Sequence, residues 1–254
     1  MCIIIYKPAG VEHPEKAILR ICNENNPDYN GFMVATGSEV IIRKGFEGVR
    51  SLRKAIRKTE KDSKIDMVKL PVVYHFRIAT SGLIKPQNSH PFPLSSKVRD
   101  LQSCNISCES GVVHNGVLSG VGSEKHLSDT QLFIRDFLSK FSFLELGEKR
   151  IKNLVNLALQ GDRFLVLNKS GLVKTWGAWL EVGGLFYSND GYKQEKWGNY
   201  FSPKGYVSGS GKVYSSNETS QFFKKSKCKS CGESFYNDEF WLKPKFVYII
   251  HVCR

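Results

Sequence analysis

The chain lacks any long run of apolar residues. No stretch approaches the roughly 20 apolar residues that a membrane-spanning helix needs. The apolar start, Cys2 to Tyr6, is too short for a signal peptide, and no cleavage site follows it. The sequence therefore predicts a protein with no membrane association, located in the cytoplasm.

Cysteines and acidic residues are also few. The seven cysteines are an odd number without the dense spacing of a secreted scaffold, so reduced thiols or metal ligands are expected rather than disulfides. The 24 acidic residues are outnumbered by 37 basic ones, which gives a net charge of +13. This charge suggests attraction to a polyanion such as nucleic acid, although a lysine-rich surface also arises from solubility alone.

There is no internal repeat, and 254 residues with 41% hydrophobic content suit one large domain with a small appendage. The patterns predict strands near both ends of this domain and helices between them, which is typical of an α+β fold of packed layers. Strands are predicted over 2–6, 72–78 and 112–114, with several more over 164–187, and a hairpin is predicted at 32–43. Three helices are predicted: one that begins at Glu47, one over 128–141 and one over 148–160. Ser128 and Gln131 are expected to form a capping box.

Cys2 directly follows the initiator methionine. Removal of Met1 leaves one residue that carries both a thiol and a free α-amine, with ordinary pKa values of about 8.5 and about 8. A nucleophile and a base then lie within bonding reach of each other, which is the minimal equipment for hydrolysis through a covalent intermediate. The alternative is that Cys2 is a packing residue under a sheet.

Four further segments carry residue types suited to amide hydrolysis. Arg77, at a strand end, offers a planar fork for a carboxylate. Asn115 and the backbone N–H of Gly116 can both point at one oxyanion. Asp129, at a helix start, can bind an ammonium group, and His90 lies in a polar loop. Singly, each has an ordinary structural alternative, such as an ion pair, a hairpin turn or a helix cap.

Together these segments resemble the glutaminase domain of the class II glutamine amidotransferases, in a stand-alone form. That family reads Cys after Met, then His-x-Arg-x-Ala-Thr-x-Gly, Asn-x-His-Pro, His-Asn-Gly and Ser-Asp-Thr. Here the corresponding segments are Cys2, 75–82, 88–91, 114–116 and 128–130, in the same order and over roughly residues 2–195. The residues after Arg77 and before Gly82 are Ile78 and Ser81, unlike the aromatic residue and histidine of relatives that make amino sugars.

The resemblance implies a four-layer α/β/β/α sandwich of the N-terminal nucleophile hydrolase type over residues 2–200. It implies that Cys2 attacks glutamine, and that Asn115 and Gly116 form the oxyanion hole. Arg77 would bind the substrate carboxylate and Asp129 its ammonium group. The backbone at Ile78 and Thr80 would line the pocket, and His90 would support it. His75 and His114 would be core or network residues. No cofactor is needed for this chemistry.

Residues 201–254 are expected to form a linker and a small basic tail. Cys228-Lys229-Ser230-Cys231 and His251-Val252-Cys253 are compatible with a structural zinc ribbon, whose ligands would be Cys228, Cys231, His251 and Cys253. The alternative is a cysteine pair in a turn and a terminal strand. Cys104 and Cys108 are expected in a loop, as ordinary thiols.

The tail is too short for a domain that uses ammonia, so the sequence predicts either a separate ammonia-accepting partner protein or simple hydrolysis. Two other functions stay open. One is an N-terminal nucleophile amidohydrolase that acts on a different γ-glutamyl amide. The other is a nucleic-acid-binding, zinc-containing module with an auxiliary amidase fold.

Overall fold

The computed structural model describes residues 2–79, 83–193, 224–227 and 234–237. The chain divides into two compact units, Met1–Lys196 and Trp197–Arg254. In the second unit, strands β12 (Lys224–Lys227) and β13 (Ser234–Asn237) pair antiparallel. The predicted site residues from Cys2 to Asp129 all belong to the first unit.

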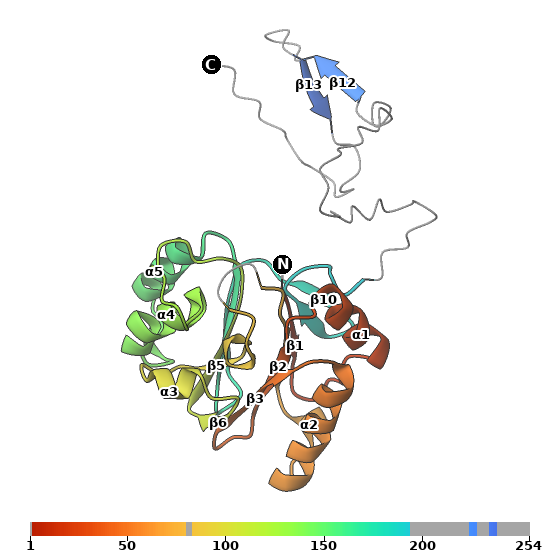
Figure 1. The fold of residues 1–254 in the computed structure, drawn as a ribbon, viewed down its shortest axis with the longest axis vertical. Coiled ribbons are helices and arrows are strands. Elements are labelled where there is room, and N and C mark those ends of the chain that lie inside the picture. The colour runs from red at the N-terminus through yellow and green to blue at the C-terminus, as the bar shows by residue number, and fades with distance from the viewer. Residues whose placement is uncertain (1, 80–82, 194–223, 228–233, 238–254) are drawn as a thin grey trace, which may run out of the picture. The chain divides into compact units, whose positions relative to one another are not determined.

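Two antiparallel sheets form the centre of the first unit (Figure 1). The seven-stranded sheet has the order β10 (Leu180–Val182), β11 (Leu185–Tyr187), β1 (Ile3–Lys7), β4 (Val72–Phe76), β2 (Asn30–Ala35), β3 (Val40–Phe46) and β6 (Asn105–Cys108). The four-stranded sheet has the order β5 (Phe92–Pro93), β7 (Ser110–Asn115), β8 (Arg163–Asn168) and β9 (Val173–Trp176).

Helices cover the outer faces of both sheets (Figure 1). Helices α1 (Lys16–Asn25) and α2 (Val49–Ser63) lie on the seven-stranded sheet, and α4 (Asp129–Asp136) and α5 (Lys149–Leu159) on the four-stranded sheet. The short helix α3 (Val98–Leu101) leads toward β6, and 3₁₀ turns occupy Met67–Lys69, Pro86–Asn88, Leu138–Lys140 and Glu145–Gly147. The described chain is thus a mixed α/β structure, compatible with the predicted α+β class.

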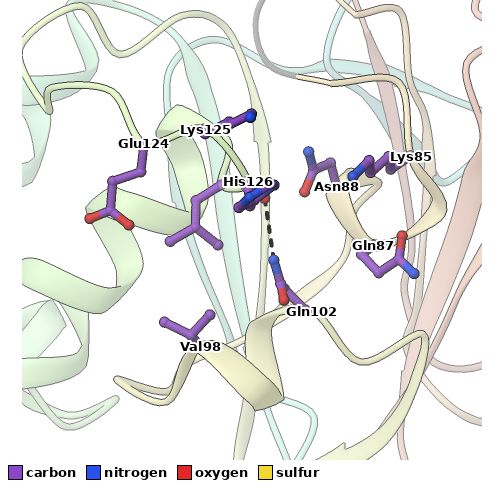
Figure 2. A pocket seen from close by; sticks show the side chains of 9 residues that line it. Lys85, Gln87, Asn88, Val98, Gln102, Glu124, Lys125 and His126 are labelled. Atoms are coloured by element: carbon purple, nitrogen blue, oxygen red, sulfur yellow. Dashed lines mark hydrogen bonds between the residues drawn. The ribbon is translucent and has the colours of Figure 1, made fainter.

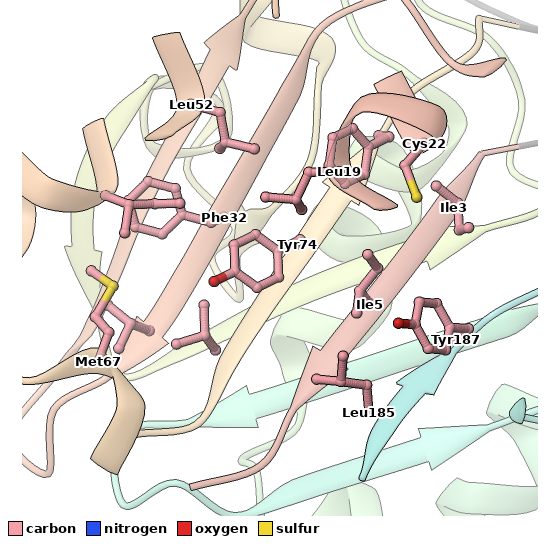
Figure 3. Packing of buried hydrophobic residues seen from close by; sticks show 14 of the residues in the cluster. Ile3, Ile5, Leu19, Cys22, Phe32, Leu52, Met67, Tyr74, Leu185 and Tyr187 are labelled. Atoms are coloured by element: carbon pink, nitrogen blue, oxygen red, sulfur yellow. The ribbon is translucent and has the colours of Figure 1, made fainter. Parts of the chain in front are cut away.

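Alternation along the strands separates three apolar cores. In β1, Ile3 and Ile5 face the α1 and α2 side, whereas Ile4 faces the space between the two sheets. Figure 3 shows the first of these cores, where Leu19 of α1 and Leu52 of α2 pack with residues of β1, β2 and β4. Successive side chains of a strand point to opposite faces of the sheet. Because both faces of β1 are covered by apolar cores, consecutive residues of this strand are all apolar, as in the three isoleucines at 3–5.

Most of the predicted elements are present. The 32–43 hairpin corresponds to β2 and β3, which pair from Asn30 to Phe46. The capping box is confirmed: the Ser128 N–H donates to Gln131 Oε1 at 2.8 Å, and the Gln131 N–H donates to Ser128 Oγ at 3.3 Å.

Two predictions were wrong. The helix expected over 128–141 ends at Asp136, and a 3₁₀ turn follows it. Contacts between the rings nevertheless continue the predicted apolar stripe across this break: Phe133 stacks on Phe137, and Phe137 meets Phe141 edge to face. Cys108 lies in strand β6 rather than in a loop.

Helix α1 was not predicted. No helix among the described residues is long and apolar enough to cross a membrane.

Candidate functional site

Cys2 lies at the end of a central strand. It immediately precedes β1, which pairs with β11 on one side and with β4 on the other. Because Ile3 lies opposite Phe76, Cys2 reaches the residues that follow β4. Its thiol donates to the Ile78 carbonyl oxygen at 3.5 Å, and the Ile78 N–H donates to Cys2 Sγ at 3.4 Å.

The backbone around Cys2 is held from the end of β11. Asn189 Nδ2 donates to the Cys2 carbonyl oxygen at 2.7 Å. Two residues further along, the Ile4 N–H donates to Ser188 Oγ at 2.9 Å, and the Ser188 N–H donates to the Ile4 carbonyl oxygen at 3.0 Å. These bonds fix the backbone from the Cys2 carbonyl group to Ile4.

The environment of Cys2 disfavours a free thiolate. Burial raises the pKa of the Cys2 thiol, and the N–H of Ile78 and the positive charge of Arg77 oppose this only in part. A thiol of this kind is a weak nucleophile at neutral pH and needs a base beside it.

Asn115 and Gly116 lie beside the thiol. Together with Cys2 and Ile78 they line a cavity of about 250 Å³, whose remaining wall includes Val117, Leu159, Gln160 and Asp162. Asn115 ends strand β7, and its Nδ2 donates to Ser188 Oγ at 2.9 Å. An amide nitrogen has two hydrogens, and this bond uses one of them.

Asp162 holds the turn that contains Gly116. Its Oδ2 accepts a hydrogen bond from the Val117 N–H at 3.0 Å and lies 3.1 Å from His114 Nε2. A Cβ on Gly116 would overlap the Asp162 carboxylate, so only glycine leaves room for this contact. The turn after β7 is therefore fixed by Asp162, which lies 46 positions beyond Gly116 in the sequence.

Arg77 and Asp129 are not among the residues that line this cavity. Arg77 is buried, and burial lowers its pKa, but the charges of Cys2, Asp28 and Asp129 raise it. Asp129 starts helix α4, and its carboxylate accepts from the Leu118 N–H at 2.8 Å and from the Thr130 N–H at 2.7 Å. The Arg77 guanidinium and the Cys2 thiol are close enough for each to shift the pKa of the other, and the Asp129 charge acts on Arg77.

Asp28 fixes the segment between Arg77 and Ala79. Its Oδ2 accepts from the Ala79 N–H at 2.8 Å, and its own N–H donates to the Arg77 carbonyl oxygen at 2.9 Å. These two bonds fix the residues on either side of Ile78, whose backbone contacts the thiol.

The three predicted histidines are buried away from the cavity lining. His75 Nε2 lies 3.1 Å from the His114 carbonyl oxygen, and His114 Nδ1 lies 3.0 Å from Thr130 Oγ1. The His90 ring stacks on His75 with centroids 4.2 Å apart and contacts Phe92. Burial lowers the pKa of His75 to about 3 and that of His90 well below its usual range, so both stay neutral at pH 7.

Several predicted residues are not placed. Thr80 and the four tail residues Cys228, Cys231, His251 and Cys253 lie outside the described residues. Among the residues that are described, no group of three or more His, Cys, Asp or Glu side chains could hold a metal ion. The zinc and nucleic-acid interpretations of the tail stay predictions.

Sequence reasoning assigned no role to Asp28, Asp162, Ser188 or Asn189. Each acts through backbone or side-chain bonds to a residue far away in the sequence. Asp162 offered one local signal, because it lies at the turn between a predicted helix and a predicted strand, where a functional side chain is common.

Neither a family model nor a curated protein sequence matches this chain. Among solved structures, it is similar to the glutamine phosphoribosylpyrophosphate amidotransferase from B. subtilis, complexed with ADP and GMP. The identity is 18% and the TM-score 0.38, over 74% of this chain and 41% of that one. The chain thus spans less than half of the length of this relative, and the similarity is a distant one of fold.

Proposed function

We propose that this protein hydrolyses the side-chain amide of glutamine through a covalent intermediate on Cys2, as a class II glutamine amidotransferase does. The observation that carries the proposal is the cavity that Cys2 shares with Asn115 and Gly116. The order of helices, two sheets and helices is consistent with the sandwich of N-terminal nucleophile hydrolases, which would extend over residues 2–200.

The first step requires a base, because burial raises the pKa of the thiol. Once Met1 is removed, the α-amine of Cys2 takes the thiol proton, directly or through a water molecule. The sulfur then bonds to the γ-carbonyl carbon of glutamine, and the electron pair of the C=O bond moves to the oxygen.

The negative oxygen is stabilised by two donors. Asn115 Nδ2 and the Gly116 N–H supply them, and Asp162 and Ser188 keep the two groups in place. The tetrahedral intermediate collapses when the α-ammonium returns its proton to the leaving nitrogen. Ammonia departs, and a γ-glutamyl thioester remains on Cys2.

Water completes the cycle. The free α-amine takes a proton from the attacking water molecule, the carbon–sulfur bond breaks, and glutamate and the thiol form. The net reaction consumes glutamine and water and yields glutamate and ammonia. We infer that a separate partner protein uses the ammonia.

Arg77 and Asp129 account for the choice of substrate. Arg77 binds the α-carboxylate and Asp129 the α-ammonium group of glutamine, with backbone at Ile78 and Thr80 lining the pocket and His90 supporting it. A substrate that lacks either charged group leaves Arg77 or Asp129 without its counterpart in the substrate, which should weaken binding about tenfold or more.

The test is release of glutamate and ammonia from glutamine by the wild type, by Cys2→Ala and by a control, Cys104→Ala. We expect Cys2→Ala to abolish release and Cys104→Ala to retain it. Glutaramide and N-acetylglutamine, which lack charged groups of glutamine, should be poor substrates. Hydrolysis of glutaramide as fast as that of glutamine would instead indicate a different amide substrate, and activity in Cys2→Ala would contradict the proposed nucleophile.

A further inference from the structure

A second cavity, of about 810 Å³, lies away from Cys2. Its wall is formed by Lys85, Gln87 and Asn88, by Val98 of α3 and the following Gln102, and by residues 124–127 (Figure 2). It shares no lining residue with the cavity of Cys2, Asn115 and Gly116. Its volume is within the range of cavities that hold small-molecule ligands.

A buried acceptor in this wall has no hydrogen-bond partner. The side chain of Asn88 is 1% exposed, and its Nδ2 donates to the Leu83 carbonyl oxygen at 3.2 Å. This bond fixes which end of the amide is oxygen, and Asn88 Oδ1 has no partner among the described residues. In Figure 2 the amide faces the side of the cavity on which His126 lies. Buried polar groups are nearly always satisfied, so Oδ1 is a suitable acceptor for an O–H or N–H group of an occupant.

The rest of the wall is positively charged and rich in amides. Lys85 and Lys125 are exposed, and no ion pair within the described part of the chain includes either one. Glu124 is the acidic residue of the wall, and its Oε1 is bound by Arg135 Nη2 at 2.6 Å. Gln87 and Gln102 add side-chain amides, and Gln102 is held by its bond to the His126 carbonyl oxygen at 3.3 Å.

We propose that this cavity binds a small polyhydroxylated anion that carries a phosphate or a carboxylate group. Lys85 and Lys125 attract the anionic group as point charges. Amides both donate to and accept from hydroxyl groups, so Gln87 and Gln102 suit the polyol part. Asn88 Oδ1 accepts from one hydroxyl of the same molecule. The inference does not depend on the reaction at Cys2.

The test is calorimetric titration of the full chain with three probes. One is 6-phosphogluconate, which carries a phosphate, a carboxylate and hydroxyl groups. The others are gluconate, which lacks the phosphate, and inorganic phosphate, which lacks the polyol. We expect saturable binding of 6-phosphogluconate, with each partial probe weaker by about tenfold or more, as loss of a charged or multidentate contact implies. If gluconate equals 6-phosphogluconate, the anionic group recognised is the carboxylate.

Variants locate the binding. Lys85→Ala with Lys125→Ala should weaken 6-phosphogluconate about tenfold or more. Lys54→Ala with Lys58→Ala, which removes the same charge from exposed positions of α2, should leave it unchanged. Asn88→Ala should weaken 6-phosphogluconate but not inorganic phosphate. Because Asn88 is buried, the thermal unfolding of the Asn88→Ala variant is measured too. If this variant does not fold, the exposed lysine variants decide the question.

Three results would overturn the proposal. The first is the absence of saturable binding of all three probes to the wild type at millimolar concentration. The second is an equal loss of binding in both pairs of lysine variants, because that would indicate net charge alone. The third is complete displacement of the probe by glutamine, because the cavity would then be part of the Cys2 site.

Discussion

Truncation of Asn115 to alanine separates a catalytic role from a structural one. In the wild type, Asn115 Nδ2 donates to Ser188 Oγ, which also accepts from the Ile4 N–H. Asn115 Oδ1 has no partner among the described residues. Alanine at this position therefore removes one internal hydrogen bond and, in the proposed mechanism, one donor to the oxyanion.

The two effects differ in size. Loss of the bond to Ser188 should lower the free energy of unfolding by about 0.5–1.5 kcal/mol, which is small beside the roughly 5–15 kcal/mol that a domain has. Loss of an oxyanion donor commonly costs about 3–4 kcal/mol in the transition state. We therefore expect Asn115→Ala to stay folded while its kcat falls by about a hundredfold or more.

The assay is steady-state release of glutamate, together with thermal unfolding of the same preparations. KM should change little, because the donor acts on charge that develops only in the transition state. Asn153→Ala, at an exposed position of α5, is the matched control and should behave as the wild type. Near-normal turnover in folded Asn115→Ala would refute the oxyanion assignment.

Three further predictions concern the surroundings of the site. Asp162→Ala removes the acceptor of the Val117 N–H and should lower kcat about tenfold with little change in KM, so unchanged kinetics would exclude a positioning role. Gly116→Ala should also lower kcat, because its Cβ overlaps the Asp162 carboxylate, and the crystal structure of the variant should show the turn displaced. For His75, burial holds the folded-state pKa at about 3 against 6.5 for an exposed histidine, so the unfolded chain binds a proton first as the pH falls. Stability should thus decline from pH 6.5 toward pH 3, and urea unfolding of His75→Gln should show a shallower decline than the wild type.

Local patterns predicted the elements that carry the site. The capping box of Ser128 and Gln131 is a contact between residues three positions apart, so the sequence contains all of its information. The strand that ends at Asn115 was predicted for the same reason, because a β-rich run meets an Asn-Gly turn signal. These elements place Asn115, Gly116 and Asp129 at the ends of a strand and a helix.

Contacts between distant residues could not be predicted in this way. Ser188 and Asn189 hold β1 and Cys2 from more than 180 positions away, and they do so because β11 pairs with β1 in the sheet. Period-two patterns give the faces of a strand but not its neighbours. The early end of α4 at Asp136 was missed for a related reason, since the phenylalanine spacing continues in the 3₁₀ turn.

The central claim, that Cys2 is the first residue of the active protein and its nucleophile, is tested most directly by mass spectrometry. Active protein is treated with a glutamine analogue that carries a diazoketone in place of the amide, and the intact mass and the labelled peptide are measured. We expect Met1 to be absent and a single adduct on Cys2, which excess glutamine prevents. Active protein that retains Met1, or an adduct on another cysteine such as Cys104 with Cys2 unmodified, would contradict the claim.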